Sequence, residues 1–192
     1  MEWLLVALGY LSGSIPFGVL VTSRFAKKDV RAEGSGNIGA TNVARVAGKK
    51  LGALVLLLDA AKGAAPVLLG LRLWPELPWL HVATASAAFA GHVFPVWLRF
   101  QGGKGVATAL GVLLVLLPLP ALVGFVTWVV VLVLTRTSSL GSLLGGLLAI
   151  VASFVLHSPL PYSLLGVGLL AAMVVTHRGN IQRLVARKEN RF

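Results

Sequence analysis

The stretch from Leu51 to Leu71, LGALVLLLDAAKGAAPVLLGL, decides the fold class of this chain. It has about the 20 predominantly apolar residues that an α-helix needs to cross the hydrocarbon core of a bilayer. Its only charged side chains, Asp59 and Lys62, are three positions apart and therefore share one helical face. Ionisable side chains inside a span usually face the helix bundle and are paired or functional. We predict a membrane span whose ion pair either steadies the bundle or takes part in chemistry.

The composition extends this interpretation to the whole chain. Of its 192 residues, 57% are hydrophobic and only 12% are charged, whereas about a quarter of the residues in a soluble domain are charged. The sequence therefore predicts an integral membrane protein with a single domain over residues 1–192. The chain contains no cysteine, which excludes disulfides and thiolate nucleophiles.

Six further apolar stretches predict additional spans. Two of them, 106–117 and 121–135, are shorter than the usual 17–25 residues, and we expect Pro118-Leu119-Pro120 to form a tight external turn between them. The alternative is one long helix over 106–135, kinked at the prolines, which would reduce seven spans to six. The predicted spans are 2–23, 51–71, 78–98, 106–117, 121–135, 138–157 and 160–176.

The basic residues favour seven spans. With the N-terminus outside, every Lys and Arg except Lys62 and Arg72 falls in a cytoplasmic segment, whereas six spans would move Arg136 and the tail outside, against the positive-inside rule. We therefore predict an all-α protein with about seven transmembrane helices, two of them short, and a cytoplasmic C-terminus. The net charge of +11 is then a topology signal, and we do not expect nucleic-acid binding.

Three polar, glycine-rich stretches fall in the predicted cytoplasmic segments. They are Gly34–Asn42 (GSGNIGATN) with Arg45 shortly after it, Gly102–Gly105 (GGKG), and His177–Asn180 (HRGN). Glycines allow successive N–H groups to form an anion-binding nest, and the GGKG turn leads into a helix that we expect to start near Val106. Lysine and arginine add charge suited to phosphate. We predict that the three stretches build one phosphate-binding site.

Other sites with similar signatures fit poorly. Residues 34–39 spell G-x-G-x-x-G, but a charged loop precedes them and a membrane span follows, so the dinucleotide-binding fold is excluded. Lys104 is followed by glycine where a P-loop has serine or threonine. No histidine pair has metal-ligand spacing, so we expect no metal site. We predict that His92 bonds loop backbone and that His177 is functional.

The combination of motifs is more specific than any one of them. The stretches Ser35–Arg45 (SGNIGATNVAR), Gly91–Pro95 (GHVFP) with Phe100–Thr108 (FQGGKGVAT), and His177–Ile181 (HRGNI) resemble the three ordered motifs of the bacterial acyl-phosphate-dependent glycerol-3-phosphate acyltransferases, the PlsY type. The resemblance covers essentially the whole chain. None of the histidines is followed by Asp at the fifth place, so the H-x-x-x-x-D box of acyltransferases that use acyl-CoA or acyl carrier protein is missing.

The resemblance implies an enzyme of the bacterial inner membrane with its active site facing the cytoplasm. It would transfer a fatty acyl group from acyl phosphate to the sn-1 hydroxyl of glycerol 3-phosphate, giving lysophosphatidic acid and phosphate, the first step of phospholipid synthesis. It implies no cofactor, and its partners would be the two substrates and membrane lipid; we expect a monomer.

Residue roles follow as hypotheses. We expect Lys104, Arg45 and the N–H groups of 34–36 and 102–105 to hold phosphates, while other polar side chains orient the substrates. The base is open between His177 and the phosphate of the acceptor; a Ser35 acyl-enzyme is a further alternative. The candidate catalytic residues are Lys104, His177 and Ser35, and the candidate binding residues are Gly34, Gly36, Asn37, Thr41, Asn42, Arg45, Gly102, Gly103, Gly105 and Asn180.

Other functional classes remain as alternatives. A transporter of an organic phosphate would also use broken helices and buried ions, but the chain has no internal repeat and its motifs gather at one surface. A CDP-alcohol phosphotransferase would need several aspartates on one span, where only Asp59 is present. In the tail, we expect residues 183–192 to be exposed and to tolerate truncation better than 177–181.

Overall fold

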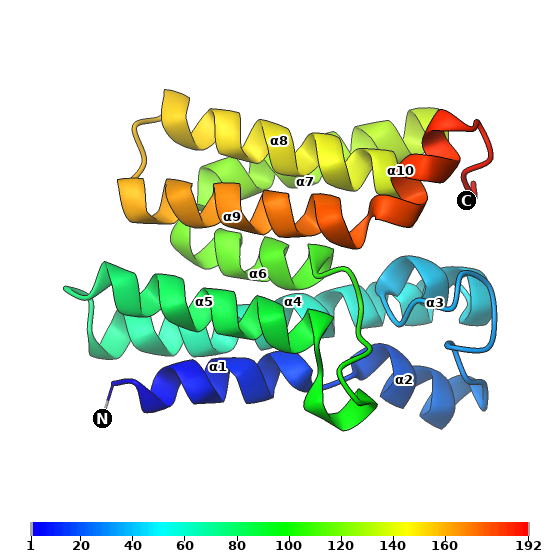
Figure 1. Cartoon of the computed structure of the whole chain (residues 1–192), viewed down its shortest axis with the longest axis horizontal. Coiled ribbons are helices and arrows are strands. Elements are labelled where there is room, and N and C mark those ends of the chain that lie inside the picture. Colours follow the sequence, from blue (N-terminus) through cyan, green and yellow to red (C-terminus); the bar gives the residue numbers. More distant parts are fainter. Residues whose placement is uncertain (1, 192) are drawn as a thin grey trace. The chain divides into compact units, whose positions relative to one another are not determined.

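The computed structural model describes residues 2–191, and every regular element in that part of the chain is a helix, as expected from the sequence. The chain divides into two compact units, Met1–Val112 and Leu113–Phe192. The prediction of a single domain over 1–192 stays a prediction. Figure 1 labels the helices in chain order.

The first unit contains the elements that carry the first two motifs. After α4, α5 packs against both α1 and α4. A short 3₁₀ turn and an irregular loop then lead into α6, which begins in this unit. The elements are α1 (Leu4–Ser14), α2 (Phe17–Val21), the π-helical turn η1 (Thr22–Ala26), α3 (Ala40–Ala47), α4 (Lys49–Leu73), α5 (Pro78–Val93), η2 (Val96–Leu98) and α6 (Val106–Leu116).

The second unit is a set of apolar helices followed by a short polar one. Helix α7 packs on α8, which in turn packs on α9. Gly124 and Gly145 let the backbones of α7 and α8 touch, because a Cβ on Gly145 would lie 2.5 Å from the carbonyl oxygen of Gly124. The elements are α7 (Pro118–Thr135), α8 (Ser138–Val155), α9 (Leu160–Thr176) and α10 (Arg178–Val185).

Several helices have the length and apolarity of membrane spans. Four helical stretches among the described residues can cross a bilayer by these criteria, and α9 with α10, bent by 64°, would make a fifth. Each of the seven predicted spans has a helical counterpart, but α5 and α6 are shorter than a usual crossing, so the count of seven and the orientation of the termini stay predictions. The four stretches are Leu4–Ala26, Lys49–Leu73, Pro118–Thr135 and Ser138–Val155.

The predicted turn at Pro118-Leu119-Pro120 is wrong. Helix α7 already begins at Pro118, and Leu117 alone separates it from α6, which ends at Leu116. Proline is well tolerated in the first helical turn, because the N–H that it lacks would have no intrahelical partner there. The alternative of one continuous kinked helix over 106–135 is also wrong, since the backbone leaves helical geometry at Leu117.

Pro66 opens a gap in the hydrogen-bond ladder of α4, and a side chain of α1 fills it. Pro66 in α4 has no N–H for the carbonyl of Lys62, four residues earlier. The Ser12 hydroxyl of α1 donates to that carbonyl at 2.8 Å. Lys62 Nζ in turn donates to the carbonyl of Ile15 at 2.7 Å, at the helix break before Pro16. These two hydrogen bonds connect the break between α1 and α2 to the middle of α4.

Close backbone contacts fix the end of α5 that leads to the second motif. A Cβ on Gly13 of α1 would lie 2.0 Å from the carbonyl oxygen of Ala88, and one on Gly91 would lie 2.2 Å from that of Tyr10. Only glycine allows such an approach, as is common between membrane helices. The C-terminal end of α5 is therefore held directly against α1.

Candidate active site

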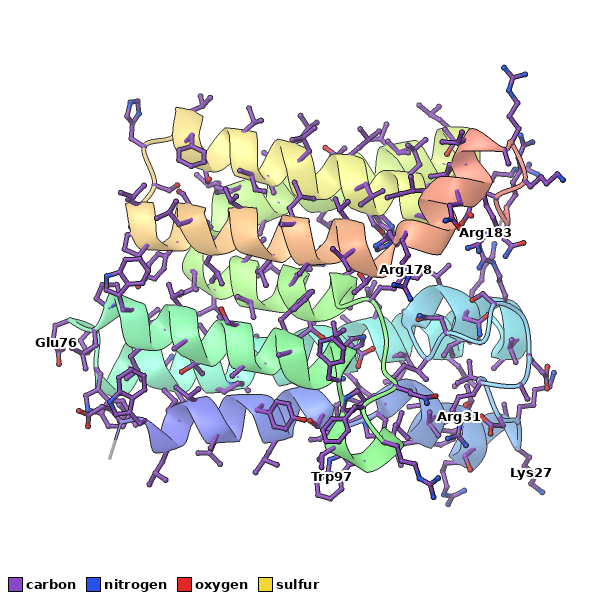
Figure 2. The ribbon with its side chains drawn as sticks, viewed as in Figure 1. Lys27, Arg31, Glu76, Trp97, Arg178 and Arg183 are labelled. Atoms are coloured by element: carbon purple, nitrogen blue, oxygen red, sulfur yellow. The ribbon has the colours of Figure 1, made fainter. Side chains whose placement is uncertain are left out.

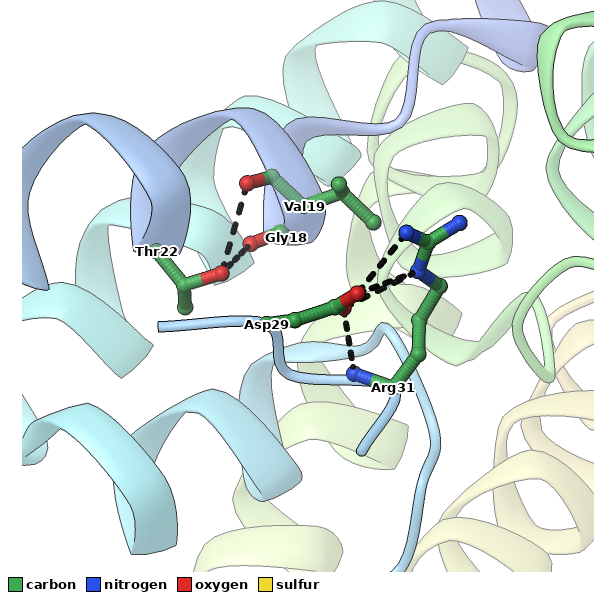
Figure 3. A network of polar contacts seen from close by, with 5 residues as sticks. All are labelled: Gly18, Val19, Thr22, Asp29 and Arg31. Carbon is green, nitrogen blue, oxygen red and sulfur yellow. Dashed lines mark hydrogen bonds and ion pairs between the residues drawn. The ribbon is translucent and has the colours of Figure 1, made fainter. Parts of the chain in front are cut away.

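The loop before the first motif carries an exposed ion pair between a carboxylate and a guanidinium group (Figure 3). Asp29 Oδ2 accepts a hydrogen bond from Arg31 Nη2 at 2.8 Å, and Oδ1 accepts from Arg31 Nε and from its backbone N–H. The side-chain bonds from Arg31, then the backbone bond, lower the pKa of the Asp29 carboxyl to about 2. On the preceding turn, Thr22 Oγ1 donates to the carbonyls of Gly18 and Val19. The exposed charges of Asp29 and Arg31 are therefore paired with each other within this loop.

A small hydrophobic cluster seats this loop and α3. Val30 and Ile38 of the loop are buried together with Val43 of α3 and Val55 of α4. Burial of such side chains is the main stabilising contribution for a short helix, which is marginal alone. No helix was predicted over the residues of α3, which were assigned from the sequence only to a polar, glycine-rich stretch in a cytoplasmic segment.

Asn42 holds the loop from inside. Its side chain is 2% exposed, its Oδ1 accepts the N–H of Ser35 at 2.8 Å, and its Nδ2 donates to the carbonyls of Val30 and Glu33, each at 3.0 Å. Both amide hydrogens are therefore used within the loop, and neither can be donated to a phosphate at the same time. Asn37 also acts locally, because its Oδ1 accepts the N–H of Gly39 at 2.9 Å.

The predicted anion nest over 34–36 is not formed as expected. The N–H of Ser35 donates to Asn42, and the N–H of Gly36 donates to the carbonyl of Glu33 at 3.1 Å. Gly34 and Gly36 have φ of +63° and +71°, a region that other residues rarely adopt. These glycines therefore permit the turn. Of the three N–H groups of residues 34–36, those of Ser35 and Gly36 are used for hydrogen bonds within the loop and α3.

Helix α3 presents the remaining polar residues of the first motif. Thr41 and Arg45 are four positions apart, so they lie on the same face, and both are half-buried. The Ser35 side chain is exposed on the preceding loop. The arrangement provides a hydroxyl and a guanidinium group that can act together on one anion.

The second motif is joined to the end of α5 by its backbone. The N–H of Gly102 donates to the carbonyl of Val93, and the N–H of Gly103 to that of His92, each at 3.0 Å. These two groups, predicted as phosphate donors, are therefore occupied. The loop enters α6 at Val106, as predicted, and Lys104, two residues earlier, is half-buried. The donors left for an anion are those of the first turn of α6, which have no intrahelical partners.

The glycines of this loop are required by close contacts. A Cβ on Gly103 would lie 2.2 Å from His92 Nε2, and one on Gly105 would lie 2.1 Å from the Phe89 ring. Gly105 also has φ of +82°. A larger residue at either position would move the loop or the buried rings.

A buried ion pair lies beneath the second motif. Lys62 Nζ is 2.8 Å from Asp59 Oδ1, and each side chain is 2% exposed, which confirms that the pair faces the interior. His92 Nδ1 lies 3.7 Å from the same carboxylate oxygen, and the imidazole is 3% exposed. The predicted bond from the His92 side chain to loop backbone stays a prediction; the bond that forms is to its backbone carbonyl, which accepts the N–H of Gly103.

The third motif, in the second unit, lies where α9 turns into α10. His177 is 2% exposed, and its Nδ1 is 2.8 Å from the carbonyl oxygen of Met173. Because a carbonyl can only accept, Nδ1 carries the hydrogen, and in the neutral ring Nε2 then has the lone pair. Asn180 is also buried, and its Nδ2 donates to a carboxylate oxygen of Glu189. Figure 2 labels Arg178 and Arg183 beside this turn.

Glu189 is the residue that sequence reasoning missed. Besides Asn180, its carboxylate accepts from Ser139 Oγ at 2.9 Å and from Arg183 Nε at 2.8 Å, and its side chain is only 7% exposed. Burial raises the pKa of Glu189, but these three hydrogen bonds outweigh it, so the pKa lies below its usual value. The expectation of a wholly exposed tail is wrong here. The signal was that Glu189 is the only acidic residue after residue 177.

Apolar helices of membrane-spanning length, with glycine-rich polar motifs at their ends, define an integral membrane enzyme. The chain belongs to the glycerol-3-phosphate acyltransferase family, whose sequence model matches residues 3–187. It is an acyltransferase by this membership and by the relatives and structures that it resembles.

The relatives are similar along their whole length. The chain is 60% identical to the glycerol-3-phosphate acyltransferase of Myxococcus xanthus (strain DK1622), covering 98% of each chain, and 44% identical to that of Pseudomonas syringae pv. syringae (strain B728a), covering 100% and 98%. A crystal structure of PlsY (YgiH), an integral membrane glycerol 3-phosphate acyltransferase in its glycerol 3-phosphate form, matches with a TM-score of 0.94 at 39% identity, covering 100% of this chain and 95% of that one. Its lysophosphatidic acid form matches with a TM-score of 0.92.

Proposed function

We propose that the protein transfers a fatty acyl group from acyl phosphate to the sn-1 hydroxyl of glycerol 3-phosphate, giving lysophosphatidic acid and inorganic phosphate in the first step of bacterial phospholipid synthesis. Family membership supports the acceptor, and the forms in which the similar PlsY was solved agree with acceptor and product. The site assignment rests chiefly on the position of Lys104. It lies in a tightly packed glycine loop just before the start of α6.

The first turn of α6 is the proposed phosphate-binding element. Its N–H groups and the positive end of its dipole favour an anion, and the Lys104 ammonium adds a full charge. Arg45 and Thr41 on α3 supply a second pair of donors, since a guanidinium group binds phosphate in a bidentate manner. In this account, Gly34, Gly36, Asn37 and Asn42 act by shaping the loop rather than by touching the phosphate.

The proposed reaction needs no covalent intermediate. The acceptor hydroxyl oxygen attacks the carbonyl carbon of the acyl phosphate, a new ester bond forms, and the bond from that carbon to the phosphate oxygen breaks. Because acyl phosphate is already an activated mixed anhydride, positioning and charge stabilisation supply the remaining rate enhancement. Lys104 neutralises the developing oxyanion or the departing phosphate, and Ser35 orients the acceptor.

The hydroxyl proton goes to a base, for which we favour the acceptor's own phosphate, with a second pKa of about 6. The alternative base is His177, whose hydrogen bond to Met173 leaves Nε2 as the basic nitrogen of the neutral ring. In His177→Gln, substrate assistance predicts retained turnover with a flat pH profile, whereas a loss of about 10²-fold would identify His177 as the base. Asn180 keeps its predicted role of orienting the substrates.

The proposed location is the bacterial inner membrane, with the motifs facing the cytoplasm and the acyl chain entering from lipid. The basic residues support this orientation, because they surround the motifs in the sequence. In the first unit, Lys27 and Arg31 lie at one end, whereas Glu76 lies at the opposite end, between α4 and α5 (Figure 2).

The direct test offers glycerol 3-phosphate to the purified protein together with palmitoyl phosphate or, in parallel, palmitoyl-CoA. We expect lysophosphatidic acid and phosphate from palmitoyl phosphate alone. Product from palmitoyl-CoA alone would overturn the donor assignment. If folded protein makes no product from either, movement of labelled glycerol 3-phosphate into proteoliposomes tests the alternative of a transporter.

A further inference from the structure

The buried pair of Asp59 and Lys62 has no part in the mechanism above. Two ionised side chains, each 2% exposed, are costly to remove from water, and well-packed apolar residues of similar size are often at least as stable. Lys62 Nζ nevertheless meets Asp59 Oδ1 at 2.8 Å. Stability alone does not explain this buried ion pair, and the residues around it indicate another role.

Lys62 is fixed on several sides. Its ammonium group donates to the carbonyl of Ile15 at 2.7 Å and lies 5.8 Å from the centre of the Phe17 ring, while its own carbonyl accepts from Ser12. These contacts come from both sides of the break between α1 and α2. Asp59 is therefore attached to a cation that cannot shift without disturbing this break.

His92 connects the carboxylate to the glycine loop. On one side of the ring, Nδ1 faces Asp59 Oδ1 at 3.7 Å; Nδ1 is buried and makes no hydrogen bond. On the other side, Nε2 packs so closely on Gly103 that a Cβ there would lie 2.2 Å from it. The carbonyl of His92 also accepts the N–H of Gly103 at 3.0 Å. Both the ring and the backbone of His92 thus set the position of Gly103.

We propose that Asp59, Lys62 and His92 form a positioning cluster for the loop 102–105. The ion pair orients the imidazole, the imidazole supports Gly103, and Gly103 places Lys104 and the first turn of α6. None of the three side chains touches substrate in this account. The proposal rests on the phosphate-binding role proposed for the loop. Because a misplacement of about 1 Å can cost about 10²-fold in rate, a rigid support beneath this loop matters for catalysis.

The proposal is tested by making His92 smaller and Gly103 larger, first singly and then together. We expect His92→Ala and Gly103→Ala each to raise the KM for glycerol 3-phosphate about tenfold or more and to weaken competition by inorganic phosphate. In the double variant, the methyl group of residue 103 enters the space of the missing ring, so the two effects should be clearly smaller than additive. Additive effects would contradict the direct contact as the route of action.

The matched control is His81→Ala. His81 lies on the same helix, is fully buried, and has Nε2 3.0 Å from the carbonyl of Trp74, far along α5 from the second motif. Its loss should lower the unfolding midpoint while leaving KM and kcat per folded enzyme unchanged. A purely structural role of His92 would give the same result in His92→Ala, and that outcome would overturn the proposal.

The ion pair is tested by replacing both charges at similar volume, with Asp59→Asn and Lys62→Met combined. We expect a protein that still folds but has a KM raised severalfold, because the imidazole loses its anionic neighbour. A lower unfolding midpoint with unchanged KM would overturn the positioning role. Lys104→Ala is the reference: if that variant keeps its KM and kcat, the loop does not bind phosphate, and the proposed role of the loop fails together with the cluster.

Discussion

The loops of the first and second motifs are both rich in glycine, but they are stabilised in different ways. The loop before α3 satisfies its own backbone with nearby side chains, chiefly Asn42, and its glycines serve turns with positive φ. The loop before α6 gives its N–H groups to the end of α5, and its glycines serve close contact with buried rings. The first loop is therefore supported from within, by its own side chains, and the second loop is supported from outside, by the end of α5.

The largest effect is expected from Gly105→Ala, because Gly105 has both a positive φ and a close contact with a buried ring. The new Cβ would lie 2.1 Å from the Phe89 ring at a residue with φ of +82°. Displacement of Lys104 should lower turnover about 10²-fold or more. The matched control is Gly48→Ala, where φ is +93° but nothing lies within 4 Å. It should lose about 1–3 kcal/mol of stability from strain but keep its activity. Equal turnover in both variants would contradict the claim that close packing of Gly105 on Phe89 positions Lys104.

The next effect is expected from Asn42→Ala, which breaks the internal support of the first loop. Three hydrogen bonds to backbone groups are lost, so the free energy of unfolding should fall by about 2 kcal/mol or more, with a raised KM. Asn37→Ala removes one bond and should lower it by about 1 kcal/mol. Denaturation in detergent measures both. The account of the loop is wrong if Asn37→Ala is the more damaging change.

A smaller, pH-dependent effect is expected at Glu189. Its pKa is lower in the folded protein, so its contribution to stability is present above the usual glutamate pKa of about 4.3 and is lost as the pH falls through the folded value. Glu189→Gln should therefore lower the unfolding midpoint at pH 7, and this effect should shrink as the pH falls through the folded value. Truncation after Arg187 should act in the same way. A difference between variant and wild type that grows on acidification would contradict this assignment.

The smallest effect is expected from Asp29→Ala. Its pair with Arg31 is exposed on both sides, and exposed ion pairs contribute little and are screened by salt. The unfolding midpoint should change slightly at low salt and not measurably at 0.5 M salt, a concentration chosen to be well above physiological. A large effect that persists in salt would mean that the first loop depends on this pair more than on Asn42.

Much of the helical frame was predictable, because apolar length and the distribution of basic residues are local signals. The start of α6 at Val106 followed from the glycines before it. A turn was predicted at Pro118 because proline breaks helices, but proline is also suited to the first turn of a helix, and α7 begins there. Helix α3 was missed because its residues are few and mixed with motif residues.

The choice of site residues stays a prediction, and their contacts could not be predicted from the sequence. The residue types of the motifs indicated phosphate, yet which N–H groups remain for it depends on partners distant in sequence, such as Val93 for Gly102. In the same way, Pro66 did not reveal that Ser12 would serve the carbonyl of Lys62. Such pairings arise only when helices meet, so the pattern of a single sequence does not specify them.

The central claim is that the second loop binds phosphate through Lys104, and the kinetics of Lys104→Ala test it most directly. The control is Lys50→Ala, which removes the same charge from an exposed position in α4. With glycerol 3-phosphate and palmitoyl phosphate, we predict that kcat/KM falls about 10³-fold in Lys104→Ala, with an unchanged unfolding midpoint, and stays at the wild-type value in Lys50→Ala. Wild-type kcat/KM in folded Lys104→Ala would contradict the account.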